Sequence, residues 1–289
     1  MKEKYKIFIT GGTGFLGSNI INKLLNQKKY DVHVLCRNSS KFVRINKKNL
    51  KKIKIYKLEH ANLENIFIKN KFDAVIHCAT NYGLRQQDIS EIIQPNLILP
   101  MRLLDLCKNY NVKAFLNTDT ILNKNISNYS LSKYHFTEWL KLFSKEFYCT
   151  NIKIEHFFGP KDDDTKFVIY IIKSFLNNSP SIQLTKGIQK RDFVYIDDVV
   201  SAINKILNYS LTKKGGFETF EIGSGKNISI KNIVLLIKKL CKNKITKTEF
   251  GKLNMRKNDA LSVSLNLNKI YKLNWKPKYS LNSSLEKTI

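Results

Sequence analysis

Short apolar segments alternate with amphipathic stretches through the first half of the chain. Residues 6–10 form an apolar run typical of a buried strand, and 15–27 carries Leu16, Ile20 and Leu24 at the spacing of one helix face. Further strands are predicted at 31–36, 54–58, 74–78, 114–117 and 152–157, with helical stretches between most of them, including a long one at 131–147. Strands that alternate with helices predict an α/β fold with a Rossmann-type, doubly wound parallel sheet.

The pattern becomes less regular after Gly159 and Pro160. A helix is predicted at 167–176, and several short extended pieces follow it. We therefore predict two domains, a dinucleotide-binding Rossmann domain at 1–157 and a smaller, C-terminal substrate-binding domain at 158–289. The segment 193–207 is a candidate to pack back on the first domain.

Composition agrees with a globular α/β protein. Hydrophobic residues make up 43% of the 289 residues, and no apolar run approaches the roughly 20 residues needed to cross a bilayer. The first residues lack a signal-peptide pattern, so the sequence predicts a cytoplasmic protein without a membrane partner. The five cysteines are scattered, with no spacing typical of a metal site or a disulfide framework.

The formal net charge of +27 raises the question of a nucleic-acid partner. The lysines are, however, spread along the chain together with abundant Asn and Ile, a mixture that AT-rich coding also produces. We predict no nucleic-acid partner. A basic surface still favours a polyanionic small molecule.

A glycine-rich turn stands between the first predicted strand and the first predicted helix. Gly11, Gly14 and Gly17 have the spacing G-x-x-G-x-x-G. Glycines permit a tight turn and a close backbone approach to a pyrophosphate, whose charge the amides at a helix N-terminus can meet. The predicted dinucleotide-binding residues here are Gly11, Thr13, Gly14, Phe15, Leu16 and Gly17; the alternative is an ordinary strand-to-helix turn.

The residues after the second strand bear on the choice of cofactor. Sites that prefer NAD place an acidic side chain there to bond the adenosine ribose, and this chain has Arg37 and Ser39 instead. Both can meet a 2′-phosphate, so we predict NADPH, with NAD(H) as the alternative. Arg37 can equally stack on adenine or be a solvated surface charge.

Tyr129 and Lys133 are four residues apart at the start of a predicted helix, so their side chains project from one face. An ammonium beside a phenol favours tyrosinate and lowers the tyrosine pKa, which suits proton transfer near neutral pH. Thr118 ends the fifth predicted strand, at the edge where open parallel sheets bind ligands. A hydroxyl there can bond the reacting oxygen.

These motifs together resemble the extended short-chain dehydrogenase/reductase family of nucleotide-sugar epimerases, dehydratases and reductases. Further matching stretches are Cys78-Ala79, Gly159-Pro160, Arg191 to Val199, Ile222 to Gly225 and Trp275 to Pro277. The resemblance implies a catalytic triad of Thr118, Tyr129 and Lys133, with Tyr129, Lys133, Cys78 and Ala79 also lining the cofactor. It implies substrate contacts from Tyr82, Thr118, Asp119, Phe158, Arg191 and Arg256, the arginines suiting a diphosphate. For each arginine the alternative is a surface ion pair.

The run Thr118-Asp119-Thr120 bears on the reaction. Dehydratases of this family carry Thr-Asp-Glu there, so Thr120 removes the base and disfavours elimination. Asp119 also suits a capping or hydrogen-bonding role. Among family groups the chain is most similar to CDP-abequose and CDP-paratose synthases, over His77 to Gly83, Asn117 to Thr120, Gly159 to Asp163 and Leu184 to Gly187.

This similarity implies NADPH-dependent reduction of the C4 ketone of a CDP- or dTDP-linked 4-keto-6-deoxyhexose, in deoxysugar biosynthesis for surface polysaccharide. A nucleotide-sugar 4-epimerase with tightly bound NAD is the main alternative, and a non-catalytic NADPH sensor or scaffold is a more remote one. Family members commonly form homodimers, to which the helix with Tyr129 and Lys133 can contribute.

Overall fold

The computed structural model describes residues 3–83, 87–255 and 260–289, which form two compact units. The first unit comprises 1–154, 200–221 and 269–275, and the second comprises 155–199, 222–268 and 276–289. The chain therefore returns to the first unit after entering the second. The returning segment begins at Val200, within the stretch 193–207 that the sequence singles out.

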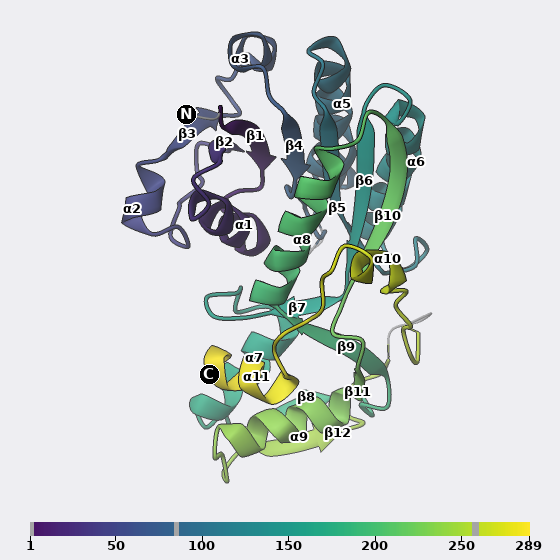
Figure 1. Cartoon of the computed structure of the whole chain (residues 1–289). Helices are drawn as coiled ribbons and strands as arrows, with labels where there is room; N and C mark the ends of the chain where they lie inside the picture. The colour runs from purple at the N-terminus through teal and green to yellow at the C-terminus, as the bar shows by residue number, and fades with distance from the viewer. Residues whose placement is uncertain (1–2, 84–86, 256–259) are drawn as a thin grey trace. The chain divides into compact units, whose positions relative to one another are not determined.

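A seven-stranded sheet forms the centre of the first unit (Figure 1). Its strands, in spatial order, are β10 (Gly216–Ile222), β6 (Tyr148–Ile154), β5 (Ala114–Thr120), β4 (Ala74–His77), β1 (Tyr5–Thr10), β2 (Tyr30–Cys36) and β3 (Ile53–Lys57). The pairs from β3 through β6 are parallel. The predicted Rossmann-type α/β fold is confirmed.

Helices cover both faces of this sheet. The described helices that lie wholly or mostly in the first unit are α1 (Phe15–Leu25), α2 (Lys47–Leu50), α3 (Leu63–Asn70), α4 (Ile89–Ile93), the π-helix η1 (Gln94–Ile98), α5 (Leu99–Asn109), α6 (Asn128–Phe143), α8 (Ile196–Ser210) and α10 (Asn268–Tyr271). On one face, α3, α5 and α6 bury Phe67, Leu104 and Phe136 against Phe8 and Phe115 of the strands. Central strands buried on both faces read as apolar runs, which is why the sequence pattern predicts them.

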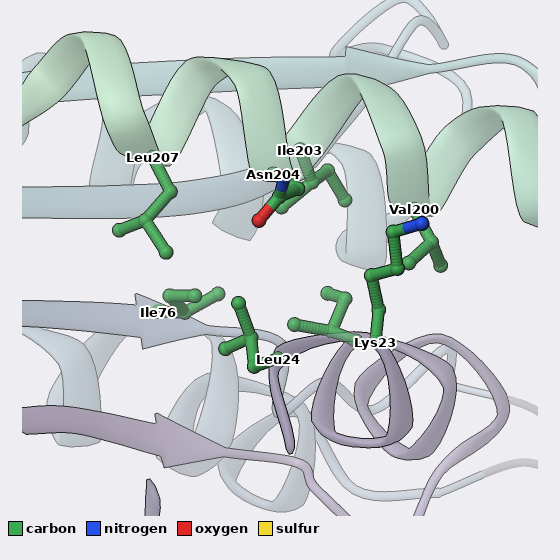
Figure 2. Close-up of a pocket in the computed structure, with 8 residues that line it drawn as sticks. Lys23, Leu24, Ile76, Val200, Ile203, Asn204 and Leu207 are labelled. Carbon is green, nitrogen blue, oxygen red and sulfur yellow. The ribbon is translucent and has the colours of Figure 1, made fainter. Parts of the chain in front are cut away.

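The opposite face of the sheet lies under α1 and α8. Figure 2 shows Leu24 of α1 and Leu207 of α8 pointing toward Ile76 of β4. At the edge of this contact, Gln27 donates a hydrogen bond of 2.9 Å to Asn204. Burial of aliphatic side chains of this size contributes about 1.5–3 kcal/mol each.

The second unit has two small sheets, β11-β9-β7 and β12-β8. Their strands are β7 (His156–Phe158), β8 (Ser181–Leu184), β9 (Lys190–Tyr195), β11 (Asn227–Ser229) and β12 (Lys247–Phe250), and the helices are α7 (Phe167–Leu176), α9 (Ile230–Leu240) and α11 (Leu281–Thr288). The helix predicted at 167–176 is confirmed. Among the helices described in both units, none is long and apolar enough to cross a membrane.

Several element boundaries differ from the sequence prediction, and the strand predicted at 152–157 is divided between the end of β6 and β7. Strand β5 continues through Thr118 to Thr120, and β6 begins at Tyr148 instead of 152. Both extensions carry buried polar side chains, Thr118 in β5 and Thr150 and Asn151 in β6. The apolar run in the sequence therefore predicts strands that are too short. Helix α6 begins earlier than predicted, at Asn128, because Ser127 caps it through the amide of Ser130.

Candidate active site

The glycine turn joins β1 to α1 in a conformation that requires glycine. Gly11 has φ +70°, and a Cβ there would lie 2.5 Å from the Ala79 nitrogen. A Cβ on Gly17 would lie 2.3 Å from the Gly11 carbonyl oxygen. Gly14 occupies the N-cap of α1 and has no side chain that could cap the helix, so the helix N-terminus can face an anion. These features fit a dinucleotide pyrophosphate.

The ends of β1 and β4 are joined beside this turn. Thr10 Oγ1 lies 2.8 Å from His77 Nδ1 and accepts a 3.3 Å bond from the Ala79 amide. The His77 ring is fully buried, and burial holds its pKa well below the usual range, so the ring is neutral. This arrangement fixes Cys78 and Ala79 against Gly11, where the sequence predicts that they border the cofactor.

The loop after β2 brings further polar groups to the same end of the sheet. Arg37 and Ser39 are exposed, as a contact with a 2′-phosphate requires. The Glu59 carboxylate accepts the Asn38 amide at 2.9 Å. Arg44, which sequence reasoning missed, lies with Nη1 3.5 Å from the Thr13 carbonyl oxygen. Arg44 is several residues beyond the end of β2, so the sequence pattern did not indicate that its side chain reaches the glycine turn.

Tyr129 and Lys133 lie in the first turns of α6. A reciprocal capping box between Ser127 and Ser130 fixes the start of this helix. Lys133 is buried, with 1% of its surface exposed, and its Nζ lies 3.4 Å from Asn117 Oδ1. Burial lowers the Lys133 pKa from its usual value of 10.5, whereas Asp119 raises it. The Lys133 ammonium is thus directed at the end of β5.

Thr118 lies two residues before the end of β5. Its hydroxyl donates a 3.0 Å hydrogen bond to the His77 carbonyl oxygen, which leaves its oxygen lone pairs to accept a further bond. The side chain is 9% exposed, so only a small part of it is open to solvent. Thr118 and Lys133 therefore approach the same strand ends.

The Tyr129 side chain interacts with one aromatic ring, that of Tyr82, and with one hydroxyl, that of Thr120. Its ring centroid lies 5.0 Å from that of Tyr82, which places this predicted substrate contact beside it. Burial raises the Tyr129 pKa above its usual value, Tyr82 and Asp119 raise it further, and a side-chain hydrogen bond from Thr120 lowers it. The phenol is consequently protonated at neutral pH and has a donor ready to stabilise the tyrosinate.

Asn96 is a second residue that the sequence reasoning missed. It lies in the π-helix η1, is fully buried, and donates to Asn81 O at 2.9 Å and to Ser132 Oγ at 3.0 Å. Its own oxygen accepts the Asn81 amide at 2.8 Å. Asn96 thus ties the loop with Tyr82 to the helix with Tyr129. A π-helical insertion shifts the register of side chains and often occurs at functional sites, but a single Asn gives no such signal in sequence.

Two of the remaining predicted substrate contacts, Phe158 and Arg191, lie in the second unit. Phe158 is 1% exposed and packs near Phe193 and Tyr195, so it forms part of the core there. Arg191 is also buried, and its Nη1 donates to the carbonyl oxygens of Lys190 and Ala260 at 2.7 and 2.8 Å. Arg256 lies outside the described residues. Their roles toward a substrate stay predictions.

Comparison with known proteins supports the interpretation of these motifs. Residues 7–223 match the model of the NAD dependent epimerase/dehydratase family. The chain belongs to this family. It is 32% identical to a CDP-abequose synthase of Salmonella muenchen over 98% of this chain and 97% of that protein. It is 28% identical to a UDP-glucuronate 4-epimerase of Thermodesulfobacterium geofontis, over 97% of this chain and 94% of that protein.

Solved structures of the epimerase/dehydratase family have the same fold. A UDP-glucose 4-epimerase of Thermotoga maritima, in complex with UDP-glucose, superposes with a TM-score of 0.84 at 25% identity, covering 98% of this chain and 97% of that one. A UDP-glucuronic acid 4-epimerase of Bacillus cereus, in complex with UDP-glucuronic acid and NAD, gives a TM-score of 0.83 at 21% identity, covering 98% and 97%. The predicted membership of the nucleotide-sugar enzymes is confirmed.

Proposed function

We propose that this protein reduces the C4 ketone of a nucleotide-linked 4-keto-6-deoxyhexose with NADPH. The observation that carries the proposal is the set of Thr118 on β5 with Tyr129 and Lys133 on α6. The chain also has a hydroxyl, that of Thr120, at the position where a dehydratase has its base. The full-length similarity to a CDP-abequose synthase supports a CDP-linked sugar in particular, with dTDP as the next choice.

Each residue of the set has a defined part in this reaction. The bound nicotinamide supplies the hydride. The protonated Tyr129 phenol donates a proton to the oxygen at C4, and Thr118 steadies this oxygen when its hydroxyl turns from the His77 carbonyl oxygen to donate to it. The Thr120 hydroxyl stabilises the negative charge that remains on Tyr129 through the hydrogen bond that lowers the Tyr129 pKa. Lys133, one turn further along the same helix, has the role that the family resemblance implies for it, which is to support Tyr129 and the cofactor.

The choice of NADPH rests on the cationic loop after β2. Arg37 is exposed there and Arg44 reaches the glycine turn, so both can meet the additional charge of a 2′-phosphate. The Asn38 amide is already bound to Glu59, so phosphate recognition falls to the side chains. In the alternative interpretation, the Glu59 carboxylate accepts a hydrogen bond from a ribose hydroxyl of the cofactor, and the site then prefers NADH.

A nucleotide-sugar 4-epimerase that retains NAD is the second candidate function. It uses the same three residues, and the match in fold to 4-epimerases favours it. The two candidates differ in their requirement for cofactor. A reductase consumes NADPH in proportion to substrate, whereas an epimerase interconverts two intact sugar nucleotides without added cofactor.

The deciding experiment incubates the purified protein with CDP- and dTDP-linked 4-keto-6-deoxyhexoses and NADPH, and follows absorbance at 340 nm together with the sugar products. We expect stoichiometric loss of NADPH, with Tyr129→Phe as the inactive control. Interconversion of sugar nucleotides without NADPH loss would assign the epimerase. Absence of turnover on CDP-, dTDP-, GDP- and UDP-linked sugars would favour the non-catalytic alternative.

The proposal includes a homodimer formed through α6. This helix exposes Leu131, Trp139 and Leu142 to solvent at 38%, 42% and 65%. Apolar side chains gathered on an exposed helix favour a protein partner. Light scattering after gel filtration should give twice the chain mass of 33.6 kDa, and Leu142→Glu should shift it toward the monomer. A monomeric mass for the unmodified chain would contradict the dimer.

A further inference from the structure

A chain of buried polar side chains connects Lys133 to Asp119. Lys133 Nζ donates to Asn117 Oδ1 at 3.4 Å, Asn117 Nδ2 donates to Asn151 Oδ1 at 2.8 Å, and Asn151 Nδ2 donates to Asp119 Oδ2 at 2.7 Å. We propose that Asp119 is a positioning residue that acts through Asn151 and Asn117 to hold the Lys133 ammonium charged and in place. This inference rests on the role proposed above for Lys133.

The direction of the hydrogen bonds favours this assignment. Every donor in the chain points toward Asp119, so each amide turns its oxygen toward the ammonium and its NH₂ group toward the carboxylate. The two amide dipoles are therefore aligned between a positive and a negative end, and aligned hydrogen bonds strengthen one another in a low-dielectric interior. Asn117 and Asn151 are both fully buried, so water does not screen the chain.

The position of Lys133 explains why such support is needed. A lysine with 1% exposure loses most of its hydration, and the charged form is expensive unless it is paired. The titratable groups that interact with it are His77 at the end of β4, Cys78 directly after β4 and Asp119 on β5. Tyr129 lies one turn earlier on its own helix. His77 is neutral, and burial raises the pKa of Cys78 to about 12, so the Cys78 thiol is neutral as well. Asp119 remains as the carboxylate of this group.

The contacts of Asp119 direct it toward this role. Oδ1 accepts the Thr120 amide at 2.7 Å, and Oδ2 accepts Asn151 together with the Thr137 hydroxyl at 3.3 Å. Both carboxylate oxygens are thus held by protein donors. The family resemblance implies a substrate contact for Asp119, whereas these contacts favour a supporting role behind the site.

The test measures the charge of Lys133 directly. Protein labelled with ¹³Cε-lysine is titrated by NMR, and the Lys133 signal is assigned by its loss in Lys133→Met. We expect the Lys133 midpoint to move to lower pH in Asp119→Asn, because the ammonium loses its carboxylate partner. The matched control is Asp73→Asn, which removes a partly buried carboxylate that binds the Lys6 amide and Lys113 at the start of β4. It should leave the Lys133 midpoint unchanged.

A second variant separates charge from packing. The exchange Asp119→Asn with Asn151→Asp returns a carboxylate to the chain, next to Asn117, and should restore the Lys133 midpoint to that of the unmodified protein or above it. If Asp119→Asn does not fold, the exchange carries the test alone. An unchanged midpoint in Asp119→Asn, or a lowered midpoint in the exchange, would overturn the proposal.

Turnover gives an independent readout. In Asp119→Asn we expect kcat to fall about tenfold, with the KM for the nucleotide sugar changed by less than about twofold, since the substrate contacts stay in place. The alkaline limb of kcat should also move to lower pH. Because the NMR titration needs no substrate, a chain that lacks reductase activity but shows the expected titration refutes the proposed function and not this inference.

Discussion

At the residue scale, the proposed chemistry depends most on the Tyr129 hydroxyl. Replacing Tyr129 with Phe removes the proton donor and keeps the ring that packs near Tyr82. We expect kcat to fall by about 10²- to 10⁴-fold with little change in stability. Steady-state turnover and thermal unfolding check this, and a variant with near-normal kcat would show that another group supplies the proton.

Thr120 acts on the same hydroxyl. Its oxygen accepts the Leu122 amide at 3.2 Å, and its hydrogen bond to Tyr129 lowers the pKa of that phenol. Thr120→Val should therefore raise the Tyr129 pKa and slow proton donation, with kcat reduced by about 5- to 20-fold. Thr120→Ser, which keeps the hydroxyl, is the matched control and should stay within about twofold of the unmodified protein. Equal losses in both variants would point to packing.

The pH dependence of turnover follows from the same residues. Burial raises the pKa of Tyr129 and lowers that of Lys133, so at neutral pH the phenol is protonated and the ammonium is the first of the two to lose its proton. Because reduction needs both protons, kcat should be flat around neutral pH and fall at alkaline pH. A profile that rises toward alkaline pH would instead indicate tyrosinate as a base.

At the element scale, the capping box of α6 supports the catalytic pair. Ser127→Ala removes the cap two residues before Tyr129 and should cost about 1 kcal/mol of stability. Looser positioning of the phenol should lower kcat severalfold. Ser280→Ala, which removes a similar cap from α11, should cost a comparable amount and leave kcat unchanged. Chemical denaturation and turnover, measured on both variants, test this prediction.

At the scale of the whole molecule, cofactor binding should stabilise the fold. A ligand at about 100 times its Kd adds about 2.7 kcal/mol to the free energy of unfolding. At equal concentrations NADPH should raise the melting temperature more than NADH does, and Arg37→Ala should remove the difference. Lys214→Ala, at another exposed basic position, is the control. A larger shift with NADH would reverse the cofactor assignment.

The sequence by itself determined the fold class and the positions of the main motifs. Apolar runs predict the buried parallel strands, and the glycine spacing predicts a turn that the φ of Gly11 and the packing of Gly17 explain. Tyr129 and Lys133 share a helix, so their spacing alone places them on one face. Each of these features depends on residues that are close together in the sequence, so the pattern of side chains is enough to predict it.

Only the tertiary structure decided which distant residues support the site. Asn151 and Asn96 are single polar residues without a motif, and their importance comes from burial beside Asn117 and Ser132. Buried polar groups must find partners, and partners far apart in sequence are chosen by how strands and helices pack. The same reason explains the boundary of β6, where buried Asn151 interrupts the apolar pattern on which the strand prediction depended.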